Sequence, residues 1–279
     1  MAVTSMATSS IKDSKKFNNM SADDSLLATG GTVTEITDGG VNYRVHTFTS
    51  SGSLVVKRAG VCEYLIFAGG GGAGYQQSTN NVGAGAGGAG GGKLDSAFLE
   101  SGTLTITVGA GGTTGASYGL DGTKGGDTTL GSIATAEGGG LGKGGGSSGA
   151  AGAGGSGGGG GGRMNASGGA SPAVSFGVAP QGSAGGSSDT TSSNITGGSG
   201  GGATGAGGGS VADDGTRAGG AGGTSTISGT SYVYGTGGSA RVRGNAAAAQ
   251  DNYGDGANSG GDLSNDNGQP GVVIVRYVI

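Results

Sequence analysis

Proline and charged residues are both scarce in this chain. There are 3 prolines and 76 glycines among 279 residues, and charged residues make up 11%. A collagen triple helix needs abundant proline beside a strict Gly-X-Y repeat, so that architecture is excluded. Disordered chains usually stay solvated through high charge and abundant proline, and this chain has neither. We therefore expect the glycine to be packed rather than to form a long flexible tether.

The residues that most enzymes depend on are also few. The single histidine, His46, lies in a strand-like run, and a lone histidine there does not suggest a nucleophilic triad. A GxxxxGK[ST] phosphate loop is absent, and GxGxxG matches are inevitable in so glycine-rich a chain. We therefore predict no catalytic residue, no cofactor and no enzyme activity.

The single cysteine, Cys62, excludes an intrachain disulfide, and its position in GVCEYLIF (60–67) predicts a buried, inert thiol rather than a reactive one. With 14 basic and 18 acidic residues, a net charge of −4 argues against nucleic-acid binding. MAVTSMATSSIKDSKK (1–16) has no apolar core of a secretory signal, and the longest apolar run is too short to cross a bilayer. We expect folding in a cytoplasm without membrane insertion.

The strongest strand patterns lie near the two ends of the sequence. VNYRVHTFTSSGSLVV (41–56) gives two short runs broken at SSG, which predicts a hairpin. VCEYLIFAG (61–69) and GVVIVRYVI (271–279) are nearly continuous apolar runs, typical of strands buried on both faces. In TLTITVGAGG (103–112), Leu104, Ile106 and Val108 alternate with threonines, which predicts a half-buried strand.

These patterns predict an all-β fold with essentially no α-helix, divided into three regions. Residues 1–40 are polar and are expected to form an N-terminal arm or docking segment. Residues 41–112 together with 271–279 are expected to form a small β-sandwich closed by the C-terminal strand. Residues 113–270 are then a large glycine-rich insertion that projects from the sandwich.

Glycine in the insertion tends to recur at every third position. The longest run comprises Gly146, Gly149, Gly152, Gly155, Gly158 and Gly161. Three residues per turn is the period of the polyproline-II-type helix, which makes no internal hydrogen bonds and must find partners outside itself. Glycine allows such helices to approach closely and bond to one another. We predict a bundle of polyglycine-II helices nucleated on the sandwich.

Longer segments that interrupt the glycine runs carry most of the aromatic residues beyond position 130 and several arginines. If the helices run back and forth, alternate interruptions gather at the far end of the bundle, where exposed loops form a natural binding surface. Tyrosine and arginine commonly anchor such surfaces. The candidate contact residues are Phe176, Tyr232, Tyr234, Arg241, Arg243 and Tyr253. The alternative is that these segments are spacers, or that the tyrosine rings cap the bundle.

An acidic stretch, residues 251–268, is a weak candidate for calcium binding. Its carboxylates are Asp251, Asp255, Asp262 and Asp266. Hard oxygen ligands on loops suit Ca²⁺, but the spacing matches neither an EF-hand loop nor a β-roll repeat. We favour solvated turn residues and predict no metal.

Four stretches together resemble a glycine-rich domain family of bacteriophage structural proteins. They are YRVHTFTSSGSLVV (43–56), EYLIFAGGGGAG (63–74), GTLTITVGAGG (102–112) and PGVVIVRYV (270–278), and SSIKDSKKFNNMSA (9–22) resembles the leader before such domains. The family is frequent in tail fibres and other virion appendages. The resemblance implies a virion protein, assembled in the host cytoplasm, that acts as a short fibre or tail-tip adhesin. The expected partners are other virion subunits through the N-terminal arm, a host polysaccharide or outer-membrane protein receptor, and further copies in a trimer.

Two other functions remain open. A purely architectural head or tail decoration protein would contact only other virion subunits. An ice-binding protein could use flat faces of a glycine bundle, but ice binding requires a regular array of exposed Ala or Thr, and the long irregular interruptions argue against one.

Overall fold

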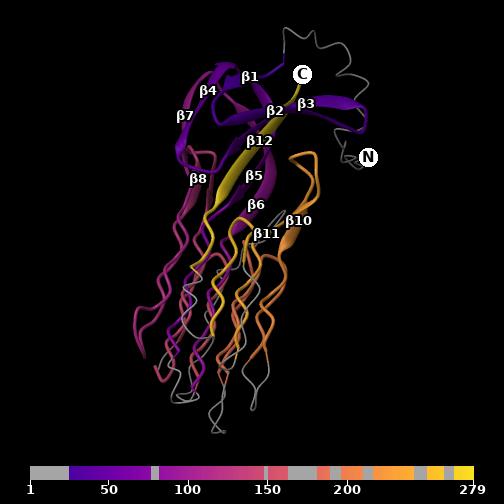
Figure 1. Cartoon of the computed structure of the whole chain (residues 1–279). Coiled ribbons are helices and arrows are strands. Elements are labelled where there is room, and N and C mark those ends of the chain that lie inside the picture. Colours follow the sequence, from indigo (N-terminus) through magenta and orange to yellow (C-terminus); the bar gives the residue numbers. More distant parts are fainter. Residues whose placement is uncertain are drawn as a thin grey trace, which may run out of the picture.

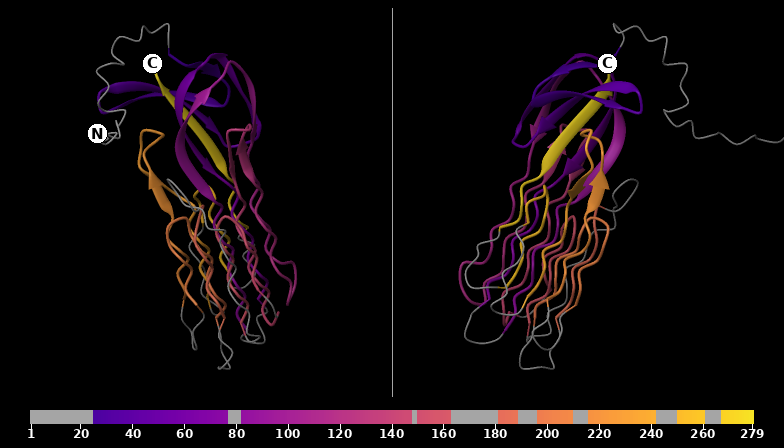
Figure 2. Two further views of the ribbon diagram at one scale, coloured as in Figure 1. Left: turned by 180° about the vertical axis from the view of Figure 1, so that it is seen from behind. Right: turned by 45° about the vertical axis from the view of Figure 1, so that its right-hand side comes forward.

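The protein consists of a β-sandwich at one end and a glycine-rich body that projects from it (Figure 1). The computed structural model describes residues 25–76, 82–147, 150–162, 181–188, 196–209, 216–241, 250–260 and 267–279. These residues contain twelve strands and no helix, so the predicted all-β class is confirmed. The C-terminus and the start of the described chain both lie at the sandwich end (Figures 1 and 2).

The first sheet of the sandwich is antiparallel and has the order β1-β4-β7-β8-β9. Its strands are β1 (Leu27–Thr29), β4 (Gly52–Arg58), β7 (Gly102–Thr107), β8 (Thr128–Leu130) and β9 (Ala134–Ala136). In β7, Ile106 is buried and the threonines are exposed, so the predicted alternation is confirmed.

The second sheet has the order β2-β3-β12-β5-β6 and is also antiparallel. Its strands are β2 (Thr32–Asp38), β3 (Val41–Phe48), β12 (Val272–Val278), β5 (Gly60–Phe67) and β6 (Gly92–Leu99). The C-terminal strand β12 lies at the centre, paired with β3 on one side and β5 on the other. Central strands are covered on both faces, which explains the continuous apolar sequences of β5 and β12.

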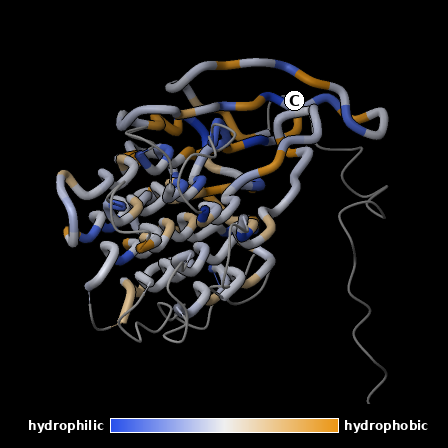
Figure 3. The backbone as a smooth tube through the Cα atoms, turned by 60° about the horizontal axis from the view of Figure 1, so that its bottom comes forward, coloured by the Kyte–Doolittle hydropathy of each residue, from blue (hydrophilic) through white to orange (hydrophobic). Residues whose placement is uncertain are grey.

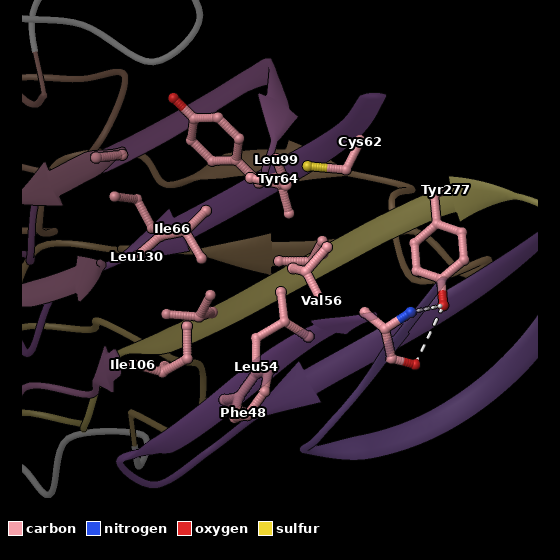
Figure 4. Packing of buried hydrophobic residues seen from close by; sticks show 14 of the residues in the cluster. Phe48, Leu54, Val56, Cys62, Tyr64, Ile66, Leu99, Ile106, Leu130 and Tyr277 are labelled. Atoms are coloured by element: carbon pink, nitrogen blue, oxygen red, sulfur yellow. Dashed lines mark hydrogen bonds between the residues drawn. The ribbon is translucent and has the colours of Figure 1, made fainter. Parts of the chain in front are cut away.

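The main hydrophobic core lies between the two sheets (Figure 4). Leu54, Ile106 and Leu130 come from the first sheet, and Ile66 and Val275 come from the second. All five side chains are at most 1% exposed. This core ties the two ends of the sequence together, because β12 packs against strands that precede it by more than 160 residues.

The predicted hairpin over residues 41–56 is wrong. Its two runs form β3 and β4, which belong to different sheets and do not pair with each other. Phe48 of β3 and Leu54 of β4 both point into the core between the sheets. The short SSG connection therefore crosses from one sheet to the other, because both runs bury their apolar faces in the same core.

The boundaries of the regions also differ from those expected. The region expected to be an arm, residues 1–40, includes β1, which pairs with β4, and β2, which pairs with β3. Strands β8 and β9 of the first sheet come from the expected insertion. Conversely, residues 68–76 and 82–91, expected in the sandwich, run through the glycine-rich body. Short strands such as β1 and β8 carry too little pattern to be recognised before their partners are known.

A second, smaller hydrophobic cluster covers part of the outer face of the second sheet. The hairpin of β10 (Gly223–Ser225) and β11 (Tyr232–Tyr234) supplies buried Tyr234, and the turn between them supplies Ile227. These side chains pack with Leu65 and Phe67 of β5 and with Ile274 of β12. The face of the sheet nearest the glycine-rich body is thus buried by the chain's own hairpin.

Backbone hydrogen bonds in the glycine-rich body repeat every three residues. One set of amides in residues 68–76 donates to residues 82–91 at a step of three: Ala68 to Gly91, Gly71 to Gly88 and Gly74 to Gly85. The next set donates to residues 120–126 at the same step: Gly69 to Gly126, Gly72 to Thr123 and Tyr75 to Leu120. Successive amides therefore point to different neighbours and return after three residues, the period of a threefold extended helix.

Residues 82–91 occupy the interior of this body. Within the described chain, their amides donate to residues 137–143, 198–201 and 254–257, and their carbonyls accept from residues 68–74, from residues 156–162 and from Gly238. The N···O distances lie between 2.8 and 3.1 Å. One segment is thus bonded to six others, and its polar backbone groups find the partners that a threefold helix cannot supply itself.

Glycine is required where these segments touch. A Cβ atom at Gly85 would lie 1.8 Å from the carbonyl oxygen of Gly159, and one at Gly87 would lie 2.0 Å from that of Gly71. Viewed from the end in Figure 3, the segments appear as coils side by side, mostly white because glycine is nearly neutral in hydropathy. We call this body the glycine lattice. The polyglycine-II conformation is defined by backbone dihedral angles and stays a prediction, whereas the period of three follows from the hydrogen bonds.

Candidate functional site

The tyrosines expected at the far end of the lattice lie instead at the sandwich end. Tyr234 stacks on Phe67 of β5, with ring centroids 5.3 Å apart. Tyr232 contacts Tyr234 at 4.8 Å and Tyr253 at 6.0 Å between centroids. The turn of the same hairpin reaches β2, because a Cβ atom at Gly229 would lie 2.9 Å from a methyl group of Ile36. The expected placement of segment 224–235 at the far end is therefore wrong.

Burial makes Tyr234 a structural residue. It is 2% exposed, and desolvation raises the pKa of its phenol to about 12. Tyr232 and Tyr253 are half-buried against it, and burial raises the pKa of Tyr232 as well. The three rings cap the lattice where it meets the second sheet, which is the alternative that the sequence had left open.

The remaining contact candidates are not brought together in the described chain. Arg241 ends a lattice segment beside Gly260, whose Cβ position lies 2.7 Å from the Arg241 carbonyl oxygen. Phe176 and Arg243 lie outside the described residues.

Asp255, one of the calcium candidates, is a buried structural carboxylate. It is 0% exposed, which contradicts the expected solvated turn residue. One carboxylate oxygen accepts from the Thr236 amide at 2.7 Å and the other from the Asn252 amide at 3.1 Å. Burial raises its pKa to about 6, although these two hydrogen bonds oppose the shift. Both oxygens thus fix a chain reversal beside the tyrosine rings.

The other calcium candidates give no site in the described chain. Asp251 is exposed, and Asp262 and Asp266 lie outside the described residues. No group of three or more His, Cys, Asp or Glu side chains suited to a metal occurs among the residues that were placed.

The far end of the lattice presents a turn that the sequence patterns did not single out. Residues 116–120 connect the lattice segment that follows β7 to the one that leads into β8 (Figures 1 and 2). Tyr118 is 41% exposed and Leu120 is 50% exposed. Two large apolar side chains thus face solvent at this end. The signal that could have found them is GASYGLDG (115–122), where bulky residues interrupt the small-residue pattern.

This far-end turn is held firmly by its neighbours. The Leu120 amide donates to the Ser117 carbonyl at 3.0 Å, and the Leu120 carbonyl accepts from the Tyr75 amide at 3.0 Å. Asp121, the next residue, accepts from Lys143 Nζ at 2.7 Å and from the Gly144 amide at 2.9 Å. The turn is therefore fixed before any partner binds, which reduces the entropy lost on contact.

His46 and Cys62 have structural roles. His46 is fully buried, with Nδ1 2.7 Å from the Gly30 carbonyl oxygen and Nε2 3.2 Å from the Tyr277 hydroxyl. Burial lowers the pKa of this imidazole. Cys62 is 2% exposed and burial raises the pKa of its thiol to about 11, so the predicted buried thiol is confirmed.

Charged groups on the outer face of the second sheet are already paired. Arg276 of β12 bonds to Glu63 at 2.7 Å and to Asp38 at 3.1 Å, and its guanidinium lies 4.5 Å from the Tyr43 ring centroid. A groove of about 300 Å³ lies between this pair and Thr226 in the turn of the β10–β11 hairpin. Because Arg276 is held by two carboxylates, it offers little free charge to a ligand in the groove.

The comparisons with known proteins identify the family. The model of a glycine-rich domain matches residues 48–278, so the chain belongs to the glycine-rich domain family. The match spans the sandwich and the lattice together. A search of curated proteins found no match. No helix among the described residues has the length and apolar character needed to cross a bilayer.

Proposed function

We propose that this protein is a virion appendage protein of a bacteriophage, a short fibre or tail-tip adhesin. The proposal rests on the difference between the two ends of the molecule. The C-terminus and the start of the described chain lie at the sandwich end, and the lattice projects away from it (Figure 2). Attachment through the sandwich end would leave the far end free to meet a host surface.

The lattice supports this role because it is stiff without a large hydrophobic core. Interior segments bond to their neighbours in several directions, so bending would break many hydrogen bonds at once. The same stiffness suits a shaft that must transmit contact at one end to attachment at the other. In this proposal the N-terminal segment contacts other virion subunits, and copies of the chain associate as a trimer.

The contact residues that we propose are revised by the structure. Tyr118 and Leu120 replace the buried tyrosine cluster as the described residues facing a host polysaccharide or outer-membrane protein. Arg243 and Phe176 stay candidates from the sequence.

Two measurements test the proposal separately. An antibody raised against the purified protein should label particles of the phage that carries the gene, and unlabelled particles would overturn the virion location. The purified protein should also compete with particles for adsorption to host cells. The double variant Tyr118→Ser, Leu120→Ser should compete at least tenfold less well. A matched variant at the sandwich end, Val33→Ser, should compete normally, since Val33 is 47% exposed there.

The same pair of results separates the architectural alternative. A decoration protein would be labelled on the particle but would not compete for adsorption. If the far-end double variant competes as well as the wild type, the far-end turn is not the contact surface.

A further inference from the structure

Part of one row of apolar side chains on the outer face of the second sheet is left uncovered by the described chain. Register places Ile36 beside Tyr43, Tyr43 beside Val278, and Val61 beside Phe98. Val278 and Val61 each lie two residues beyond the paired Arg276 and Glu63, so they are neighbours as well. Ile36 packs against the hairpin turn at Gly229, and the Arg276 guanidinium lies over the Tyr43 ring. We call the remaining three residues, Val278, Val61 and Phe98, the outer row; it crosses β12, β5 and β6.

The outer row is exposed where the rest of the face is buried. Val278, Val61 and Phe98 are 46%, 54% and 56% exposed. Four residues nearer the lattice on the same face, Ile274 and Leu65 are 2% and 0% exposed under the β10–β11 hairpin. The hairpin thus covers the half of the face nearest the lattice and stops at the Arg276–Glu63 pair.

The size of the uncovered surface argues against a second copy as its cover. About half of each of the three side chains is exposed, which amounts to on the order of 300 Å². A stable interface between two proteins needs about 800 Å² on each partner. A surface this narrow, one side chain deep and three strands wide, fits a single extended segment.

The segment best placed to cover the row is the chain's own N-terminal stretch. The described chain begins at Ser25, whose carbonyl accepts from Arg58 Nε at 2.6 Å. The next residue, Leu26, lies 3.0 Å from the Cβ position of Gly60, the residue directly before Val61. Because Gly60 and Val61 face opposite sides of the sheet, residues 1–24 join the described chain on the core side of β5 and reach the outer row by passing around the end of that strand.

Length and composition of this stretch agree with that occupant. Phe17 and Met20 are its large apolar residues closest to Ser25, separated by Asn18 and Asn19. Eight residues from Phe17 to Ser25 span up to about 26 Å, and three strands spaced at 4.8 Å are about 10 Å across. Phe17 can therefore reach any member of the row. The tether also keeps the local concentration of the segment high.

We propose that residues 17–24 of the same chain lie across the outer row and place Phe17 and Met20 against Phe98 and Val61, while residues 1–16 extend beyond it. The segment completes the cover that the β10–β11 hairpin begins, so the outer face of the second sheet is buried along its length. This inference does not rest on the proposed virion function.

Methyl NMR with a soluble paramagnetic agent tests the cover directly. In the full chain, the Val61 and Val278 methyl groups should relax several-fold more slowly than those of Val33 and Val233. These reference valines lie outside the row and have similar exposed fractions in the described chain, 47% and 41%. The fully buried Val275 methyl reports that the sandwich is folded.

Two double variants test whether Phe17 and Met20 form the cover. Phe17→Ser with Met20→Ser should raise relaxation at Val61 and Val278 to the level of the reference valines. The matched variant, Asn18→Ser with Asn19→Ser, should change nothing. Equal relaxation at row and reference valines in the wild type would overturn the proposal. So would protection that grows with protein concentration, because that result would identify a second copy as the cover.

Discussion

Substitution of Gly87 by alanine tests whether the lattice is held by close backbone contact. The new Cβ atom would lie 2.0 Å from the Gly71 carbonyl oxygen, while unstrained heavy atoms stay about 3.5 Å apart. The two segments must separate by more than 1 Å, so hydrogen bonds now at 2.8 or 2.9 Å are lost. Among them are Gly71 to Gly88 and Gly87 to Ala257.

The expected loss follows from the number of bonds at risk. Leaving a buried backbone group without a partner costs about 1–3 kcal/mol, and the displacement affects two to four such groups. We expect Gly87→Ala to lower the free energy of unfolding by about 4 kcal/mol, a large part of the 5–15 kcal/mol typical of a domain.

The control is a lattice glycine with space around it. A Cβ atom at Gly208 would meet its nearest neighbour, Arg217 Cδ, at 3.5 Å. Gly208→Ala should therefore be neutral, or stabilise by about 0.5 kcal/mol through a less flexible unfolded chain. Urea unfolding followed by tyrosine fluorescence measures both variants. Equal stability of Gly87→Ala and Gly208→Ala would refute the close-packed lattice.

Three other substitutions or reactions test the structural roles of buried polar groups. Because the pKa of Asp255 is raised from 3.8 to about 6, its ionised form is disfavoured in the folded state, and a penalty of about 3 kcal/mol develops as the pH rises from about 4 to about 6. In urea unfolding, the Asp255→Asn variant should lack this part of the pH dependence, and an identical pH profile would contradict the burial argument. Tyr277→Phe removes the hydroxyl that accepts from the Ala28 amide at 3.1 Å and lies 3.2 Å from His46 (dashed lines at Tyr277 in Figure 4 mark hydrogen bonds of this hydroxyl). The free energy of unfolding of this variant should therefore fall by about 1–3 kcal/mol. Cys62, with a thiol pKa of about 11, should react with iodoacetamide at pH 8 only after denaturation, and rapid reaction of the native protein would show that the core is open.

Several elements of the fold were predictable from local sequence. The continuous apolar runs of β5 and β12 identified strands buried on both faces, and the alternation in β7 identified a half-buried one. Glycine at every third position indicated segments with three residues per turn. The pattern is local because a side chain is excluded at each position where the backbone touches a neighbouring segment.

The path of the chain through the lattice was not predictable in the same way. The run from Gly146 to Gly161 has an unbroken period of three, yet it does not form one helix. Gly152 and Gly155 donate to Leu141 and Gly138, so this part runs antiparallel to residues 137–146. Residues 156–162 then accept from the same segment in the parallel sense. Glycine provides no side chain to mark where a segment ends, so reversals leave little trace in the sequence.

In the candidate site, too, the residue types were predictable from the sequence but their positions were not. The tyrosines and arginines in residues 232–253 predicted a contact surface at the far end. An aromatic ring packs against whatever apolar surface is available, however, and Tyr234 stacks on Phe67 of β5. The pairing of β3 and β4 with different sheets likewise depended on a core assembled from distant segments.

The sequence by itself determined the fold class and the kinds of segment in this protein: an all-β fold, a few strongly apolar strands, and long stretches in which only small residues are tolerated. These properties follow from side-chain volume and spacing, which each residue carries locally. The tertiary structure decided which segments are neighbours, which tyrosines are buried and which apolar row the β10–β11 hairpin leaves uncovered. Backbone hydrogen bonds between glycine segments are chemically alike, so only the packing of the whole chain selects among them.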